Sequence, residues 1–237
     1  MTRNEAVYDV WWSHAESEES MEDEHRPGWD EVIRLMPETD LSACKVLDFG
    51  CNRGGFLRHL HQARPFAQGV GVDLGAESVK LAEQRKGALP LTYANTGSPE
   101  ALGIAFDLAF ALSVIYLVGD LPEHARKIAA ALRPGGVYYV TYTDLSDNAS
   151  AAFFKREIER YSRLEAHMHA LDDFADAFAA AGFQTQAMRR QPSGFLTLGS
   201  ERDFFRSSRD YVKSQYEETY LLRFSLSPGL AGQSERS

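Results

Sequence analysis

Short apolar runs alternate with helix-length segments between Lys45 and Thr143, and this alternation constrains the fold more than any other feature. Short runs rich in Val, Leu and Phe are typical of strands buried on both faces. Strands that alternate with helices form parallel βαβ units with helices on both faces of the sheet. The sequence therefore predicts a doubly wound α/β fold, with strands at residues 45–49, 69–73, 91–94, 106–112 and 137–143.

The alternation ends after Asp144. We expect helices at 151–168 and 172–181, strands at 183–188 and 219–226, and an irregular or helical stretch at 194–216. Before the sheet, we expect two helical pieces, joined by an exposed acidic stretch at 16–24, with the second beginning at Pro27. This predicts an N-terminal helical lid at 1–41, one domain at 42–228 and a flexible tail at 229–237.

The segment Val46–Leu57 carries the strongest chemical signal. Its predicted buried strand ends in an acid, Asp48, and a glycine-bearing turn leads into a helix. Glycines let the backbone approach a ligand closely, and the helix N-terminus offers free N–H donors. A dinucleotide site would have a glycine at Asn52, and a pyrophosphate gains nothing from Asp48. An acid here suits a cationic ligand group, such as an ammonium.

A second acid, Asp73, ends the second predicted strand. A carboxylate accepts two hydrogen bonds at once, so Asp73 can bind both hydroxyls of a ribose. Together, Asp48 and Asp73 suggest an adenosine-type ligand with an amino acid tail.

Four motifs in this order resemble the class I S-adenosylmethionine-dependent methyltransferases: Val46–Gly54, Gly71–Leu74, Phe106–Ala109 and Leu132–Gly136. The resemblance covers about residues 42–190. Asn52 stands where the family more often has glycine, but asparagine tolerates turns with positive φ. The resemblance implies a Rossmann-like, seven-stranded sheet, mostly parallel with the last strand antiparallel. It also implies an N-terminal helical lid and a helical insertion before the last strand.

The same resemblance implies S-adenosyl-L-methionine as cofactor and S-adenosyl-L-homocysteine as product. Asp48 and Gly50 would lie along the methionine part, Asp73 would hold the ribose, and Leu74 would pack on the adenine. The expected cofactor-binding residues are Asp48, Gly50, Cys51, Asn52, Gly54, Asp73, Leu74, Asn95, Thr96 and Ser113. Asn95 is equally well explained as a turn residue.

Methyl transfer from a sulfonium is an in-line displacement, which chiefly requires a positioned acceptor and a dry site. A base is needed only when the acceptor carries a proton that must leave. Acceptors in such folds bind at the carboxyl ends of the strands, so the candidate catalytic residues are Tyr116, Tyr142 and Asp144. Cross-strand packing is an equal alternative for Tyr142. The candidate substrate-binding residues are Tyr8, Trp12, His14 and Phe195, an aromatic set that suits a planar or apolar small molecule.

Charge and motifs narrow the acceptor class. The net charge is −9 and the pI about 5.3, which argues against general nucleic-acid binding. The segment Ala111–Val114 lacks the Asn/Asp-Pro-Pro-aromatic motif, so the resemblance does not point to adenine or glutamine amide nitrogens. We expect methylation of an O, N or C atom of a small organic molecule. The alternatives are a protein or RNA acceptor, a non-methylating S-adenosylmethionine binder and a nicotinamide oxidoreductase.

The remaining expectations concern metal, location and assembly. We expect no metal site, because two histidines at i and i+2 on a helix face apart, so that His167 and His169 mark a solvated helix end. Cys44 and Cys51 cannot form a disulfide framework, and no apolar run is long enough to span a membrane. We therefore expect a cytoplasmic monomer or homodimer that binds neither nucleic acid nor membrane.

Overall fold

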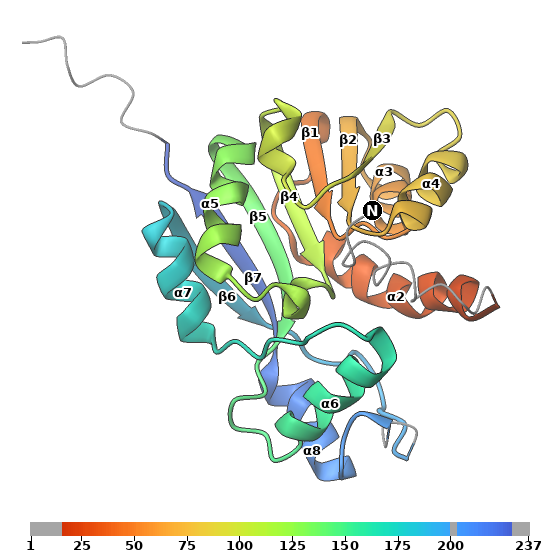
Figure 1. Ribbon diagram of the computed structural model, residues 1–237, viewed down its shortest axis with the longest axis vertical. Coiled ribbons are helices and arrows are strands. Elements are labelled where there is room, and N and C mark those ends of the chain that lie inside the picture. Colours follow the sequence, from red (N-terminus) through yellow and green to blue (C-terminus); the bar gives the residue numbers. More distant parts are fainter. Residues whose placement is uncertain (1–15, 200–202, 229–237) are drawn as a thin grey trace, which may run out of the picture.

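The computed structural model describes residues 16–199 and 203–228, and its centre is a seven-stranded sheet (Figure 1). The strand order is β3-β2-β1-β4-β5-β7-β6. Strands β1 to β5 are parallel, whereas β7 runs antiparallel to both β5 and β6. The expected sheet with an antiparallel last strand is confirmed. The strands are β1 (Leu41–Phe49), β2 (Phe66–Asp73), β3 (Leu91–Asn95), β4 (Phe106–Leu112), β5 (Leu132–Thr143), β6 (Phe183–Arg189) and β7 (Thr219–Leu226).

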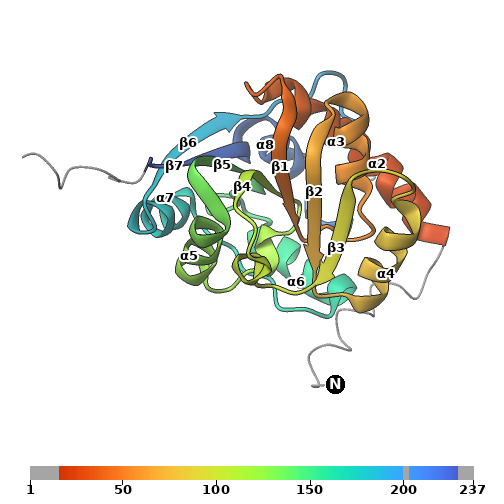
Figure 2. The same ribbon diagram turned by 90° about the horizontal axis from the view of Figure 1, so that it is seen from above.

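Helices cover both faces of the sheet (Figure 2). On one face lie α2 (Glu16–Leu35), α3 (Gly55–Ala63) and α4 (Ala76–Arg85). On the other lie α5 (Leu121–Ala131) and α7 (Leu171–Ala180). Two further helices, α6 (Ala151–Ser162) and α8 (Ser208–Lys213), lie beyond the carboxyl ends of the strands, where Figure 1 shows them below the sheet.

The two cores follow from the two-residue period of the strands. In β5, Tyr138 and Val140 belong to the core under α5 and α7, while Tyr139 belongs to the core under α3. Because successive side chains of a strand point to opposite faces, a central strand needs apolar residues at consecutive positions. The apolar runs that predicted the strands are therefore the runs that build both cores.

The N-terminal segment differs from expectation. Helix α2 runs without a break through the acidic stretch, and Pro27 lies inside it rather than at a helix start. Tertiary contacts explain the difference: Glu22 forms ion pairs with Arg58 (2.9 Å) and Arg85 (3.3 Å), which stabilise the acidic half of the helix. The expectation of a joint at 16–24 is therefore wrong, although Asp23 and Glu24 are exposed.

The segment after α6 also differs. The helix ends at Ser162, where Arg163 adopts a left-handed conformation (φ 56°). The following residues form a loop against the sheet, in which Nε2 of His169 lies 2.7 Å from the carbonyl oxygen of Val118. His167 and His169 are therefore not at a solvated helix end, and their rings stack 6.2 Å apart. The described residues contain no group of three or more His, Cys, Asp or Glu side chains that could hold a metal ion.

Within residues 16–199 and 203–228, no helix combines the length and the apolar character needed to cross a membrane. The expected first part of the lid, residues 1–15, and the tail at 229–237 lie outside the described residues.

Candidate active site

A cavity of about 420 Å³ lies at the carboxyl ends of β1, β2 and β4, in the size range of small-molecule sites. Its walls come from the loop after β1, the loop after β4, helix α2, and two segments beside α6 and α8. The lining residues are Glu22, Glu24, His25, Trp29, Asp48, Gly50, Cys51, Asn52, Arg53, Gly55, Phe56, Asp73, Ser78, Leu112, Ser113, Val114, Tyr116, Leu117, Leu164 and Phe204. Residues that the motifs predict to bind a ligand therefore line the same cavity as residues from segments that contain no motif.

The loop after β1 is held tightly against β2. The backbone N–H groups of Gly50 and Cys51 both donate to the carbonyl oxygen of Val72, at 2.8 and 3.0 Å. The N–H of Asn52 donates to Oδ2 of Asp73 at 2.9 Å. Asn52 has a φ of 50°, so asparagine here adopts the left-handed conformation for which the family more often uses glycine. The loop thus couples the ends of β1 and β2 in one rigid wall.

Asp48 is a strongly perturbed acid of the cavity. It is only 3% exposed, and its carboxylate makes no hydrogen bond to another described residue. Burial, and secondly the charge of Asp73, raises the pKa of Asp48 to about 8. A buried carboxylate is costly unless a cation or donors compensate for its lost hydration. The site therefore suits a ligand that brings a positive group to Asp48.

Asp73 lies at the end of the neighbouring strand and organises two turns. Its Oδ1 accepts a hydrogen bond from the N–H of Gly75 at 2.8 Å, while Oδ2 binds Asn52 as described above. A carboxylate oxygen can accept two hydrogen bonds, so Asp73 has the chemistry to bind ligand hydroxyls. Beside it, the fully buried hydroxyl of Ser78 makes no hydrogen bond within the described part of the chain. Such a buried hydroxyl needs a partner, which a polar ligand group in the cavity would supply.

The structure brings many of the expected cofactor residues to the cavity wall: Asp48, Gly50, Cys51, Asn52, Asp73 and Ser113. Gly54 stands directly behind the wall, where an added Cβ would lie 2.2 Å from the hydroxyl oxygen of Tyr93.

Three more of the expected cofactor-binding residues, Leu74, Asn95 and Thr96, are not on the cavity wall. Leu74 is 41% exposed. The side-chain amide of Asn95 donates to the carbonyl oxygen of Asp73 at 3.0 Å, and Oγ1 of Thr96 accepts from the N–H of Ser98 at 3.0 Å. Thr96 therefore stabilises a local turn, whereas Asn95 joins the end of β3 to the end of β2.

The three candidate catalytic residues lie in different surroundings. Tyr116 lines the cavity, and burial raises the pKa of its phenol to about 12. The Tyr142 hydroxyl donates to the carbonyl oxygen of His169 (2.6 Å) and accepts from its N–H (2.7 Å). Asp144 accepts from the N–H groups of Ser146 (3.0 Å) and Leu171 (3.1 Å). The structure thus uses Tyr142 and Asp144 to anchor the loop before α7, and neither lines the cavity.

The expected substrate-binding residues are not gathered at the cavity. Phe195 is fully exposed and absent from its wall, so the structure does not place it at the site. Another aromatic residue from the same stretch of chain, Phe204, lines the cavity instead. Tyr8, Trp12 and His14 lie outside the described residues.

Helix α2 supplies the wall that the motifs did not predict. Glu22, His25 and Trp29 follow one another at i, i+3 and i+7, so they share one face of the helix, and all three line the cavity. Trp29 packs edge-on against Phe56, with ring centroids 6.0 Å apart. A Cβ on Gly55 would lie 2.8 Å from Cη2 of Trp29 and 2.9 Å from Cδ of Glu22. Gly55 therefore permits the close contact between α2 and the first turn of α3.

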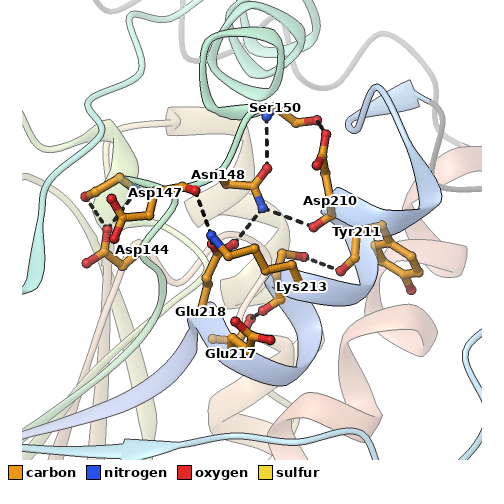
Figure 3. A network of polar contacts seen from close by, with 12 residues as sticks. Asp144, Asp147, Asn148, Ser150, Asp210, Tyr211, Lys213, Glu217 and Glu218 are labelled. Carbon is orange, nitrogen blue, oxygen red and sulfur yellow. Dashed lines mark hydrogen bonds and ion pairs between the residues drawn. The ribbon is translucent and has the colours of Figure 1, made fainter.

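A polar network joins the loop after β5 to α8, next to the cavity segments beside α6 and α8 (Figure 3). The side-chain amide of Asn148 donates to Oε2 of Glu218 (2.6 Å) and to the carbonyl oxygen of Asp210 (3.0 Å). Lys213 forms an ion pair with Glu218 (2.8 Å), and the Ser150 hydroxyl donates to Oδ2 of Asp210 (2.6 Å). The network joins the loop after β5 to α8 and the start of β7. It thereby holds the start of α6 and the helix α8 in place. These are the helices next to the cavity residues Leu164 and Phe204.

The sequence model of the methyltransferase domain family matches residues 21–187. The chain belongs to the class I S-adenosylmethionine-dependent methyltransferase family. This confirms the resemblance seen in the motifs and identifies S-adenosylmethionine as the cofactor.

Individual relatives and structures agree with this placement. A trans-aconitate 2-methyltransferase of Rhodopseudomonas palustris (strain BisB18) is 31% identical over 57% of this chain and 52% of its own length. A ubiquinone biosynthesis O-methyltransferase of a Methylobacterium species (strain 4-46) is 31% identical over 44% of this chain and 43% of its own. The chain thus spans about half the length of these relatives. A Haloferax volcanii methyltransferase, solved in complex with the Trm112 activator, has the same fold, with a TM-score of 0.75 and 19% identity over 93% of this chain and 97% of its own.

Proposed function

We propose that this protein transfers a methyl group from S-adenosylmethionine to an O, N or C atom of a small organic molecule bound in the cavity. The observation that carries the proposal is the pair Asp48 and Asp73, two strand-end acids on the wall of one cavity. The bound cofactor supplies a sulfonium-activated methyl group. What the chain must add is binding, orientation and exclusion of water.

The residues at the ends of β1 and β2 and in the loop after β1, which we call the cofactor wall, fit the cofactor. Asp48 would pair with the ammonium of its amino acid end, which compensates the buried carboxylate. Asp73 would accept hydrogen bonds from the ribose hydroxyls, with the buried hydroxyl of Ser78 beside it as a further polar partner. Ser113 and the loop from Gly50 to Gly54 would follow the methionine part. We keep Leu74 as the proposed apolar contact for the adenine, because its exposed side chain stands next to Asp73 in the chain.

The residues contributed by α2, by the loop after β4 and by the segments beside α6 and α8, which we call the acceptor wall, fit an acceptor. Trp29 on α2, Tyr116 after β4 and Phe204 before α8 give the cavity three aromatic side chains from three separate segments. We propose that they orient the acceptor and keep water out, with α2 as the described part of the expected lid. With its pKa near 12, the phenol of Tyr116 stays protonated at neutral pH, so it serves as a hydrogen-bond donor rather than a base. We give Tyr142 and Asp144 no contact with the acceptor, since their polar atoms bind the backbone.

A small acceptor is favoured over a protein or an RNA. The cavity lies between α2 and the α6–α8 segments rather than on an open face, and the chain carries a net charge of −9. Relatives named for trans-aconitate and for ubiquinone biosynthesis support the same class.

Calorimetry with S-adenosylhomocysteine and with NADH tests the cofactor site. We expect saturable binding of the first ligand only. Asp73→Asn should weaken that binding by about tenfold, because a charge-assisted hydrogen bond contributes roughly 1.5–3 kcal/mol. The control is Asp172→Asn, an exposed acid in the first turn of α7 that does not line the cavity. Binding of NADH, or equal affinity of wild type and Asp73→Asn, would contradict the proposal.

A further inference from the structure

The charges on the cavity wall are one-sided. Its described lining residues include four acids, Glu22, Glu24, Asp48 and Asp73, against the single guanidinium of Arg53, and Asp48 is ionised once the cofactor's ammonium faces it. No lysine is among them. Clefts lined by one sign of charge raise the local concentration of ligands of the opposite sign. The cavity therefore favours cationic over anionic ligands.

The four acids have different partners. Asp48 and Asp73 belong to the proposed cofactor wall, and Glu22 is held by Arg58 and Arg85. Glu24 is exposed at the cavity edge and forms no ion pair with a described residue. An acceptor that enters past α2 thus meets one uncompensated carboxylate.

The neighbouring histidine does not offset that charge. His25 follows Glu24 on α2 and packs edge-on against Trp29, with ring centroids 6.1 Å apart. Burial lowers the pKa of His25 below its ordinary 6.5, more than the charge of Glu24 raises it. The imidazole is therefore neutral at pH 7, and α2 presents no cation of its own to the acceptor.

The rest of this part of the cavity is apolar or aromatic. Trp29, Tyr116 and Phe204 contribute rings, and Leu117 and Leu164 contribute aliphatic surface. Ring faces attract cations, whereas an anion would meet only one described basic side chain on the cavity wall, that of Arg53. We infer that the acceptor is an amine on an aromatic or other apolar frame, which the cavity takes up in its ammonium form. This inference rests on the proposed methyltransferase function and names the acceptor class of the same site.

The chemistry of an amine acceptor balances without any further reagent. The ammonium first gives a proton to water at the exposed edge beside Glu24, because a protonated nitrogen has no lone pair. The nitrogen lone pair then forms the N–C bond to the methyl group, and the C–S bond breaks with its electron pair remaining on sulfur. The positive charge passes from sulfur to the methylated nitrogen, and a neutral thioether remains.

Binding to the protein saturated with S-adenosylhomocysteine tests this inference without a turnover assay. The probes are 3-phenylpropylamine, 3-phenylpropan-1-ol and 3-phenylpropionate, which share a ring and differ in charge. We expect calorimetry to show the amine bound about tenfold more tightly than the carboxylate, with the alcohol between them. Glu24→Gln should reduce the amine preference about threefold, as expected for a partly exposed ion pair. The matched control, Asp23→Asn, removes the adjacent acid, which pairs with Arg26 and does not line the cavity.

Three results would overturn the inference. The first is tighter or equal binding of the carboxylate. The second is an amine preference that falls equally in Asp23→Asn and Glu24→Gln. The third is a protein that binds S-adenosylhomocysteine but none of the three probes, which would leave the cofactor site standing and reject only the acceptor class. A failure to bind S-adenosylhomocysteine itself would instead reject the proposed function.

Discussion

Binding of S-adenosylhomocysteine should depend on pH through Asp48. With a pKa of about 8 in the empty cavity, roughly nine-tenths of the Asp48 carboxyl groups are protonated at pH 7. The ammonium of the ligand favours the charged carboxylate, so binding lowers this pKa. Protons are therefore released on binding, and affinity rises with pH until the free group is itself ionised. We expect about a tenfold gain per pH unit below pH 8, and a plateau above it.

Two measurements check this linkage. Calorimetric titrations at pH 7 in phosphate and in Tris, whose ionisation enthalpies differ, should report about 0.9 proton released per ligand bound. Titrations from pH 6 to pH 8 should show the rise in affinity. Asp48→Asn should abolish both effects and weaken binding, whereas the exposed control Asp172→Asn should change neither. Tight binding with no proton release at pH 7 would refute the role given to Asp48.

Further predictions concern stability and the two walls of the cavity. Because Asp48 is ionised above about 3.8 in the unfolded chain but only above about 8 in the folded one, it destabilises the empty protein progressively between these pH values, by on the order of 4 kcal/mol at pH 7. Asp48→Asn should therefore raise the free energy of unfolding in urea at pH 7, and a fall would contradict the calculation. Gly55→Ala should destabilise the protein by roughly 1–3 kcal/mol through overpacking against Trp29 and speed tryptic cleavage in α2 at Arg34, while Gly194→Ala, where a Cβ meets nothing within 4 Å, should do neither. Asn148→Ala removes one donor to Oε2 of Glu218 and one to the carbonyl oxygen of Asp210, so the free energy of unfolding should fall by roughly 1–3 kcal/mol. In calorimetry, the same variant should weaken binding of 3-phenylpropylamine more than binding of S-adenosylhomocysteine. An equal loss of affinity for both ligands would contradict a role of the network at the acceptor wall.

The sheet was predictable because its signals are local. β4 and β7 have the bounds expected from their apolar runs, and Asp48 and Asp73 lie on one cavity because parallel strands end at one edge of a sheet. The strand-end acids and the glycine turn need no distant partner to be placed. This is why the wall that we propose for the cofactor follows from the sequence.

The acceptor wall depends on contacts between segments far apart in the chain. The acidic half of α2 is held by Arg58 and Arg85, which composition alone cannot reveal. The spacing of Glu22, His25 and Trp29 on one helical face was the available signal, but it shows only once the helix is known to continue through Pro27. Tyr142 does not line the cavity as expected, because the loop at 163–170 folds back and the backbone of His169 binds the Tyr142 hydroxyl.

Aromatic composition was likewise insufficient to choose between Phe195 and Phe204. Both lie in the same irregular stretch before β7, yet only Phe204 is anchored, with its ring 5.8 Å from that of Phe154 on α6. Phe195 has no such neighbour among the described rings and is fully exposed. Which ring faces the cavity is thus decided by the packing of α6, a feature without a sequence motif.

A methyl-transfer assay tests the central claim most directly. The protein would be incubated with methyl-labelled S-adenosylmethionine and a panel of small apolar amines, phenols and alcohols, with Asp73→Asn in parallel. We predict a labelled small-molecule product one methyl group larger than its acceptor, formed at least about tenfold more slowly by the variant when the cofactor is subsaturating. Label transferred only to a protein or RNA acceptor, or a wild-type product yield matched by Asp73→Asn under those conditions, would contradict the account.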